Sequence, residues 1–261
     1  MNDIRQAVRE AYGKIAEAGS ADTGCCGPST CCGGAEPSVN EISQDAGYSK
    51  SDASGVPDGA DLGLGSGKPV ALADLKPGET VLDLGSGGGV DCFLAARSVG
   101  EEGTVIGVDM TPEMVALARK NAVKAGVTNV DFRLGEIEHL PVGDESVDAI
   151  ISNCVINLSP EKATVFRDAY RVLKPGGRLA VSDVVATREM PDEVRGDLAQ
   201  HAGCVAGAVT VPELETLLAE AGFQEIQIRL SEEAGKESCG SGPGASAESL
   251  VVPATIEAIR P

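Results

Sequence analysis

The sequence is poor in aromatic residues and in basic residues. It has no Trp and only 3% aromatic residues, and its 21 Lys and Arg face 40 Asp and Glu, which gives a formal net charge of −19. A surface this acidic repels phosphate, so we expect no nucleic-acid partner. The 261 residues are enough for one large or two modest domains, whose core must be built from Val, Leu, Ile and Ala.

Long apolar stretches are also missing. No run reaches the roughly 18 apolar residues of a membrane span, so we expect none. The first residues, MNDIRQAVREAYGKIAEAG, are interrupted by charges, which is typical of an amphipathic helix and not of a signal peptide. We therefore expect a cytoplasmic protein, and we expect it to be a monomer. In a reducing compartment its eight cysteines are more often ligands, nucleophiles or core thiols than disulfides.

Four of the cysteines lie in one short stretch, TGCCGPSTCCGG, as Cys25, Cys26, Cys31 and Cys32. The surrounding residues 20–68 are poor in apolar side chains, so we expect this segment to be flexible or to be ordered by a ligand. Three interpretations are open: capture of a substrate that prefers sulfur, a structural metal such as zinc, or a redox role or none. Adjacent Cys pairs lack the C-x₂-C spacing of zinc knuckles, which favours capture.

From Lys76 onward, short apolar runs alternate with segments of helical periodicity. We expect strands in ETVLDLG, GTVIGVDM, NVDFRLGEIEHLP, SVDAIISNCVIN and RLAVSDVVA, with helices between them. One helix is delimited clearly, by Thr111 and Pro112 at its start and by Gly126 at its end. The alternation predicts an α/β fold with a doubly wound, mostly parallel sheet.

The chain beyond this sheet predicts a small C-terminal α+β extension. Residues 190–211 indicate a largely helical segment, Thr210 and Glu213 a capping box, and FQEIQIRL and SLVVPATIEAIRP two more strands. We therefore divide the chain into three parts: an N-terminal helix with the Cys-rich segment (1–70), a Rossmann-like cofactor domain (71–186) and a substrate-side segment that completes the sheet (187–261).

A glycine loop follows the first of these strands, in VLDLGSGGGVD. It is neither a dinucleotide fingerprint, because Val90 stands at the third glycine position, nor a P-loop, because no Lys follows. A G-x-G-x-G loop lets the backbone pass close to a ligand, and Asp109, 20 residues after Gly89, could hold ribose hydroxyls. A ribose without pyrophosphate points to S-adenosylmethionine, whose carboxylate suits the start of the following helix.

The stretch VLDLGSGGG…VIGVDMTPEM resembles the class I S-adenosylmethionine-dependent methyltransferases over roughly residues 75–185. Ordinary packing would explain Met110 and Ile137 equally well without this family. The resemblance implies that the methionine part of the cofactor lies near Asp83, Gly85, Ser86, Gly87 and Gly89. It places Asp109 and Met110 at the ribose and Glu136 and Ile137 at the adenine, and it adds Asn153, at the end of the fourth strand, to the cofactor-binding residues.

Two single cysteines lie near the expected ligand edge. Cys154 ends the fourth strand and Cys204 follows the sheet, and each alone is most often a small core side chain. Yet GEIEHLPV, SNCVINLSP, RVLKPGGRLAVSDVV and AGCVAGA together resemble the arsenite methyltransferase family. That resemblance implies trivalent arsenic held by Cys154, Cys204 and an N-terminal cysteine, with arsenite as substrate and a small thiol or thioredoxin as reductant. Soft thiolates suit such a centre.

One position departs from the family. Ser66, in GLGSGKP, stands where the resemblance implies a cysteine, so the third ligand stays open among the four N-terminal cysteines. His201 could support the Cys204 thiolate, although an ordinary surface histidine is the simpler interpretation, and we assign no chemistry to His139. Two other functions also remain: a methyltransferase for a small organic substrate, and a non-catalytic protein that binds arsenic or a metal.

Overall fold

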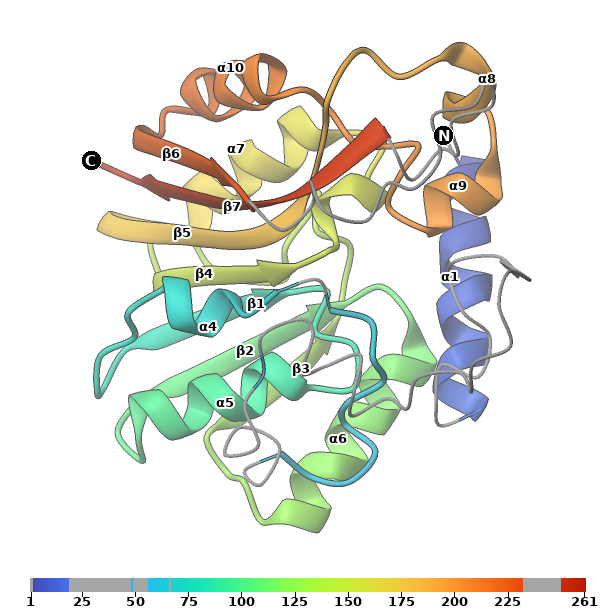
Figure 1. Ribbon diagram of the computed structural model, residues 1–261. Helices are drawn as coiled ribbons and strands as arrows, with labels where there is room; N and C mark the ends of the chain where they lie inside the picture. Colours follow the sequence, from blue (N-terminus) through green and yellow to red (C-terminus); the bar gives the residue numbers. More distant parts are fainter. Residues whose placement is uncertain (1, 19–47, 49–55, 66, 232–249) are drawn as a thin grey trace.

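The structure is a computed structural model that describes residues 2–18, 48, 56–65, 67–231 and 250–261. Its centre is a seven-stranded sheet in the order β3-β2-β1-β4-β5-β7-β6 (Figure 1). Strands β1 to β5 pair in parallel, and β7 is antiparallel to both β5 and β6. The strands are β1 (Thr80–Leu84), β2 (Thr104–Asp109), β3 (Val130–Leu134), β4 (Val147–Asn153), β5 (Leu173–Ala186), β6 (Gln224–Leu230) and β7 (Val251–Ile259).

Helices cover both faces of this sheet, which confirms the predicted doubly wound α/β fold. One buried cluster joins α5 and α6 to one face, and a second joins α7 and α10 to the other. Among the described helices, none is long and apolar enough to cross a membrane. The helices are α1 (Asn2–Ala18), α4 (Pro69–Leu72), α5 (Val90–Val99), α6 (Pro112–Ala125), the 3₁₀ turn η1 (Ile156–Leu158), α7 (Lys162–Val172), α8 (Asp192–Arg195), α9 (Leu198–Ala202) and α10 (Val211–Ala221).

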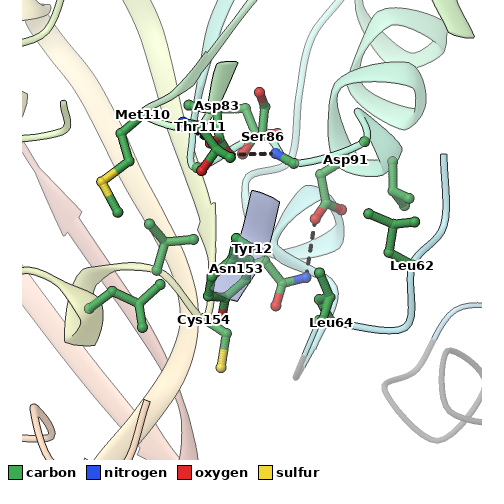
Figure 2. Close-up of a pocket in the computed structure, with 18 of the residues that line it drawn as sticks. Tyr12, Leu62, Leu64, Asp83, Ser86, Asp91, Met110, Thr111, Asn153 and Cys154 are labelled. Atoms are coloured by element: carbon green, nitrogen blue, oxygen red, sulfur yellow. Dashed lines mark hydrogen bonds between the residues drawn. The ribbon is translucent and has the colours of Figure 1, made fainter. Parts of the chain in front are cut away.

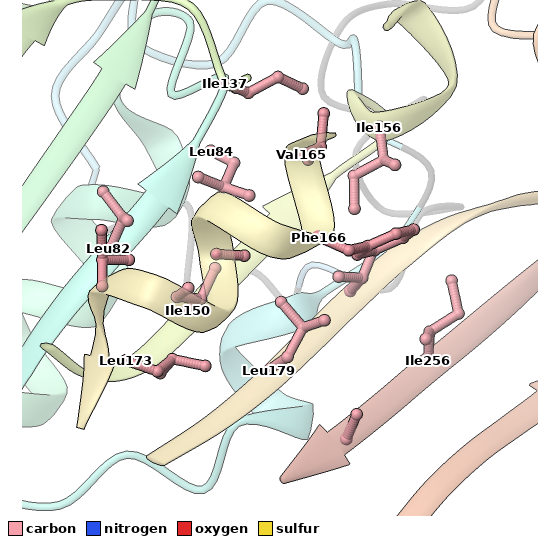
Figure 3. Close-up of a cluster of buried hydrophobic side chains, with 14 of the residues drawn as sticks. Leu82, Leu84, Ile137, Ile150, Ile156, Val165, Phe166, Leu173, Leu179 and Ile256 are labelled. Carbon is pink, nitrogen blue, oxygen red and sulfur yellow. The ribbon is translucent and has the colours of Figure 1, made fainter. Parts of the chain in front are cut away.

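The larger core cluster lies between α7 and the sheet (Figure 3). Phe166 of α7 packs there with Ile150 and Leu179, and all three are at most 1% exposed. Burying a side chain of this size stabilises the fold by about 1.5–3 kcal/mol. A Phe166→Ala change would leave a cavity and cost about 3–5 kcal/mol.

The local signals in the sequence behave as expected at α6 and α10. Thr111 precedes α6, Pro112 is its first residue, and Gly126 ends it with a φ of 67°. Such a left-handed C-cap suits glycine, which has no Cβ to clash. The capping box of Thr210 and Glu213 is present at the start of α10.

Three boundaries differ from the sequence prediction. Strand β4 ends at Asn153 because Cys154 adopts a left-handed φ of 58°, which interrupts the extended backbone. Strand β5 begins at Leu173, because Leu173 pairs with Val147 of β4, five residues before Arg178 pairs with Ala149. Residues 190–211 form only α8 and α9, since Gly196 and Gly203 each end a helix after one turn.

The ligand edge of the sheet is covered from two distant parts of the chain. The parallel strands end where α1 and α9 lie side by side, on the right of Figure 1. The first helix of the sequence therefore packs against a segment about 190 residues later, as the hydrogen bond from Tyr12 to Ala202 illustrates. This arrangement places α1 over the carboxyl ends of the strands, where open α/β sheets bind ligands.

Candidate active site

A cavity opens at the carboxyl ends of β1, β2 and β4 (Figure 2). Its volume is about 130 Å³. Its walls come from the glycine loop, the ends of these strands, residues 60–65 and α1. Eight of the ten cofactor residues expected from the sequence line it, and Gly89 and Glu136 do not; the eight are Asp83, Gly85, Ser86, Gly87, Asp109, Met110, Ile137 and Asn153.

The glycine loop borders the cavity with backbone atoms. Its first two amides, at Gly85 and Ser86, donate to the carbonyl oxygen of Val108 at 2.7 and 3.0 Å. A Cβ added at Gly87 would meet no atom within 4 Å, whereas one at Gly85 would lie 2.4 Å from Val155. Both glycines have left-handed φ values, 68° and 49°. Side chains are thus kept out of the loop, and a ligand can approach its backbone.

Asp109 is held at the end of β2 by two backbone amides. Its carboxylate oxygens accept hydrogen bonds from Gly87 at 3.0 Å and from Thr111 at 2.8 Å. Burial raises the pKa of this carboxyl group, while these two bonds act in the opposite direction. Each oxygen can still accept another hydrogen bond. The geometry therefore suits a pair of hydroxyl donors such as those of a ribose.

A second buried group in the cavity wall has no partner of its own. The hydroxyl of Ser86 makes no hydrogen bond within the described part of the chain, although the residue is 7% exposed and lines the cavity. An unpartnered buried polar group costs about 1–3 kcal/mol unless a ligand or water satisfies it. Together with Asp109 and the bare loop, it fits a polar nucleoside such as that of S-adenosylmethionine.

The expected adenine residue Glu136 makes contacts outside the cavity. Its carboxylate lies 3.3 Å from Arg9 and 3.9 Å from Arg5, both on α1. The next acidic residue, Glu138, is 3% exposed, lines the cavity, and accepts hydrogen bonds from Arg5 and Ser159. The ion pairs of these two arginines therefore attach α1 to the edge of the cavity. The role of Glu136 at an adenine stays a prediction.

Cys154 and Cys204 are brought together. The Cys204 thiol donates to the carbonyl oxygen of Cys154 at 3.0 Å, and Cys154 lines the cavity. Both residues belong to one mostly apolar cluster with Val8, Leu158 and Met110. Both also have left-handed φ values, 58° and 64°, a conformation that non-glycine residues adopt rarely and mostly where the surroundings impose it.

The turn that carries Cys154 is fixed from β5. The Cys154 amide donates to the carbonyl oxygen of Ser182 at 2.8 Å. The buried carboxylate of Asp183 accepts from the backbone of Ile156 at 3.1 Å and from the side chain of Asn157 at 2.9 Å. These bonds hold the chain immediately after Cys154 and so set where its thiol can point.

His201 corrects a sequence expectation. We expected a surface histidine, but its side chain is only 6% exposed, because α9 packs it against the residues around Gly207. Neither ring nitrogen has a hydrogen-bond partner among the described residues. Burial, and then the charge of Lys162, lower the pKa of this imidazole, so it is neutral near pH 7.

The remaining predicted thiols cannot be placed. Cys25, Cys26, Cys31, Cys32 and the departing Ser66 all lie outside the described residues. Within the described ranges, no group of three His, Cys, Asp or Glu side chains is arranged to hold a metal ion. The third arsenic ligand therefore stays a prediction.

Sequence reasoning missed two cavity residues near Asn153. The Tyr48 hydroxyl donates to the Asp91 carboxylate at 2.8 Å, and the Asn153 side-chain amide donates to the same carboxylate at 3.1 Å. Asp91 is the one charged side chain in the buried stretch DCFLAA of α5. A charge at an otherwise apolar position was the signal that could have identified it.

The fold and the cavity define a class of protein. The chain is a methyltransferase domain of the Rossmann-like type: the family model described as "Methyltransferase domain" matches residues 75–222. Solved structures agree. A crystal structure of an arsenic(III) S-adenosylmethionine methyltransferase from Chlamydomonas reinhardtii superposes with a TM-score of 0.63 at 32% identity, covering 86% of this chain and 73% of that one.

Relatives with higher sequence identity show which methyltransferase family the chain belongs to. The arsenite methyltransferase of Halobacterium salinarum is 51% identical over 270 residues, which cover 99% of this chain and 67% of that protein. The human arsenite methyltransferase is 44% identical over 55% of this chain and 40% of its own length. The chain thus spans two thirds of the first relative and less than half of the second. It belongs to the arsenite methyltransferase family.

Proposed function

We propose that this protein transfers methyl groups from S-adenosylmethionine to trivalent arsenic bound by its cysteines. The observation that carries the proposal is the meeting of Cys154 and Cys204 beside the cavity, with the Cys204 thiol 3.0 Å from the Cys154 carbonyl oxygen. Soft thiolate sulfur is the matching ligand for soft trivalent arsenic. S-adenosylmethionine supplies an electrophilic methyl group when it is bound.

Capture of arsenite needs no general base. Each thiol that replaces a hydroxyl of arsenous acid forms one S–As bond, breaks one As–O bond, and gives its proton to the departing hydroxyl as water. The Cys204 thiol must leave the carbonyl oxygen of Cys154, to which it donates a hydrogen bond. The third sulfur is proposed to come from Cys25, Cys26, Cys31 or Cys32.

Methyl transfer is then mainly a matter of position. The arsenic lone pair forms the new As–C bond, the S–C bond of the donor breaks, and its electron pair stays on that sulfur. Arsenic is thereby oxidised from the trivalent to the pentavalent state. A small thiol or thioredoxin is the proposed reductant that returns it to the trivalent state with two electrons. The residues of this chain contribute by orientation: Asp183 fixes the Cys154 turn, and α1 excludes water.

The test is arsenic speciation by chromatography after the purified protein has been incubated with arsenite, S-adenosylmethionine and a dithiol. We expect methylated arsenicals from the native protein, and a fall of at least about a hundredfold in Cys154→Ser and in Cys204→Ser. Cys239→Ser, at a cysteine with no proposed role, is the matched control. Absence of methylated arsenic from the native protein would contradict the proposal, and arsenite binding without donor consumption would instead support sequestration.

The setting of the reaction is part of the proposal. A charge of −19 repels nucleic acid, and the described helices give no membrane span. We infer a cytoplasmic monomer that meets arsenite directly. Size-exclusion chromatography with light scattering checks the oligomeric state.

A further inference from the structure

One buried carboxylate in the cavity wall has an oxygen that accepts no hydrogen bond from the described residues. Glu138 is 3% exposed and lines the cavity. Its Oε1 accepts three hydrogen bonds, from Nε and Nη2 of Arg5 at 3.3 and 3.0 Å and from the Ser159 hydroxyl at 2.6 Å. Its Oε2 is not among the fully buried atoms without a partner, so this oxygen still borders open space. For a side chain this buried, that space is the cavity.

The two residues that hold this carboxylate belong to the part of the wall where the thiols meet. Ser159 directly follows Leu158, which packs with Cys204 in one buried cluster. Arg5 precedes Val8 of the same cluster by about one turn of α1. The carboxylate is therefore fixed, by two side chains from distant parts of the chain, next to the site proposed for arsenic.

The ligand that suits the second oxygen of Glu138 is a neutral donor. Arg5 already pairs with the charge of this carboxylate at 3.0 Å, so a second cation is not required. A carboxylate oxygen can only accept hydrogen bonds. Arsenous acid is a neutral molecule whose three hydroxyls can donate them. When two thiols have replaced two of these hydroxyls, one hydroxyl stays on arsenic.

We propose that Glu138 accepts a hydrogen bond from the hydroxyl that remains on arsenic once Cys154 and Cys204 have bound it. This inference rests on the proposed function, because it takes arsenite as the substrate of that thiol pair. When a third thiol arrives, its S–As bond forms, the As–O bond breaks, and the thiol proton leaves with the hydroxyl as water. The carboxylate is unchanged by this exchange.

The contact makes Glu138 a determinant of substrate specificity. In methylarsonous acid a methyl group takes the place of one hydroxyl. After the two thiols have bound this molecule, no hydroxyl is left on arsenic, and the methyl group offers Oε2 no donor. Glu138 thus adds affinity for inorganic arsenite that methylated arsenic does not receive.

The test compares arsenous acid with methylarsonous acid by isothermal titration calorimetry, without methyl donor. Both are titrated into the full chain with its four N-terminal cysteines replaced by serine, so that Cys154 and Cys204 supply the sulfur. Cys204→Ser in the same background gives the residual binding. We expect Glu138→Gln to weaken arsenous acid about tenfold, the difference between a charged and a neutral acceptor. Binding of methylarsonous acid should change less than about twofold.

Glu161→Gln is the matched control. It removes another carboxylate that pairs with Arg5 but does not line the cavity, so it weakens the attachment of α1 in a similar way. Both arsenicals should keep their affinity within about twofold. Should Glu138→Gln not fold, Ser159→Ala withdraws the hydroxyl that holds Oε1, and selective weakening of arsenous acid is again expected.

Equal loss of both arsenicals in these variants, or loss of neither, overturns the inference. It is also overturned if Glu138→Gln weakens S-adenosylhomocysteine and leaves both arsenicals unaffected, because the carboxylate then belongs to the donor site. If the thiol pair shows the expected selectivity but the native protein does not methylate arsenite, this inference stands and the proposed function is wrong. If neither arsenical binds to the thiol pair, both are wrong.

Discussion

The two ends of the cavity are built in different ways. The nucleoside end comes from consecutive elements, and its bonds join near neighbours, such as the amide of Thr111 to Asp109. The thiol end joins Cys154 to Cys204, 50 residues later, and covers them with Val8 of α1. A local motif contains its own partners, whereas the thiol end exists only once the whole fold has formed. The two ends should therefore respond differently to substitution.

The largest effect should come from the residue where the two ends touch. Gly85→Ala puts a Cβ 2.4 Å from Val155, directly after Cys154, at a φ of 68°. We expect a loss of about 3 kcal/mol in the free energy of unfolding, because the left-handed cost and a clash add. Gly126→Ala has a left-handed φ of 67° and no atom within 4 Å of the added Cβ, so it should lose only about 1–2 kcal/mol. Equal losses in urea unfolding would show that the ends are independent.

Removing the support of the Cys154 turn should affect the thiol end alone. The two carboxylate oxygens of Asp183 accept hydrogen bonds from backbone and side-chain donors. Asp183→Asn leaves these donors a single acceptor oxygen. We expect about 2 kcal/mol of lost stability and weaker arsenite binding, with S-adenosylhomocysteine affinity unchanged in calorimetry. Asp131→Asn, at an exposed ion pair with Arg133, is the control and should cost less than about 0.5 kcal/mol. An equal loss of both ligands would remove the distinction between the ends.

The buried carboxylate of Asp91, beside Asn153 in the cavity wall, should show its own pH dependence. Burial raises the pKa of Asp91 to about 6, so the folded protein holds this proton more tightly than the unfolded chain does. The stability of the ligand-free protein should fall as pH rises from about 4 through about 6, and then level off. In Asp91→Asn this fall should shrink by about 2–3 kcal/mol, leaving the ligand-free variant more stable than the native protein at about pH 8. If the stabilities of the native protein and of Asp91→Asn, measured by thermal unfolding, changed with pH in the same way, the raised pKa of Asp91 would be contradicted.

The smallest effect is expected at Tyr12, where α1 covers the thiol end. The Tyr12 hydroxyl donates to the Ala202 carbonyl oxygen at 3.4 Å, near the limit for a hydrogen bond. Tyr12→Phe keeps the ring that packs near Met110 and Cys154 and should cost less than about 0.5 kcal/mol, with less than a roughly twofold change in arsenite affinity. A tenfold loss would mean that this hydroxyl touches the substrate.

The same contrast explains what could be predicted from the sequence. Local motifs of the sequence predicted the glycine loop, Asp109 and the boundaries of α6, because each is marked by residue types that are adjacent or regularly spaced in the sequence. The family resemblance supplied Cys154 and Cys204, but neither the left-handed turn that ends β4 nor the burial of His201 has a local signal. Tyr48 and Asp91 escaped notice because their contact joins residues 43 positions apart.

The ion pairs of α1 with distant residues have a consequence for the order in which the chain folds. Arg5 pairs with Glu138 and Glu161, which follow it by 133 and 156 residues. Most of the stability of a helix such as α1 comes from tertiary packing and not from the helix itself. During synthesis α1 is therefore made long before Glu138 and Glu161. The helix that covers the thiol end is translated before its partners and can pack only after they have formed.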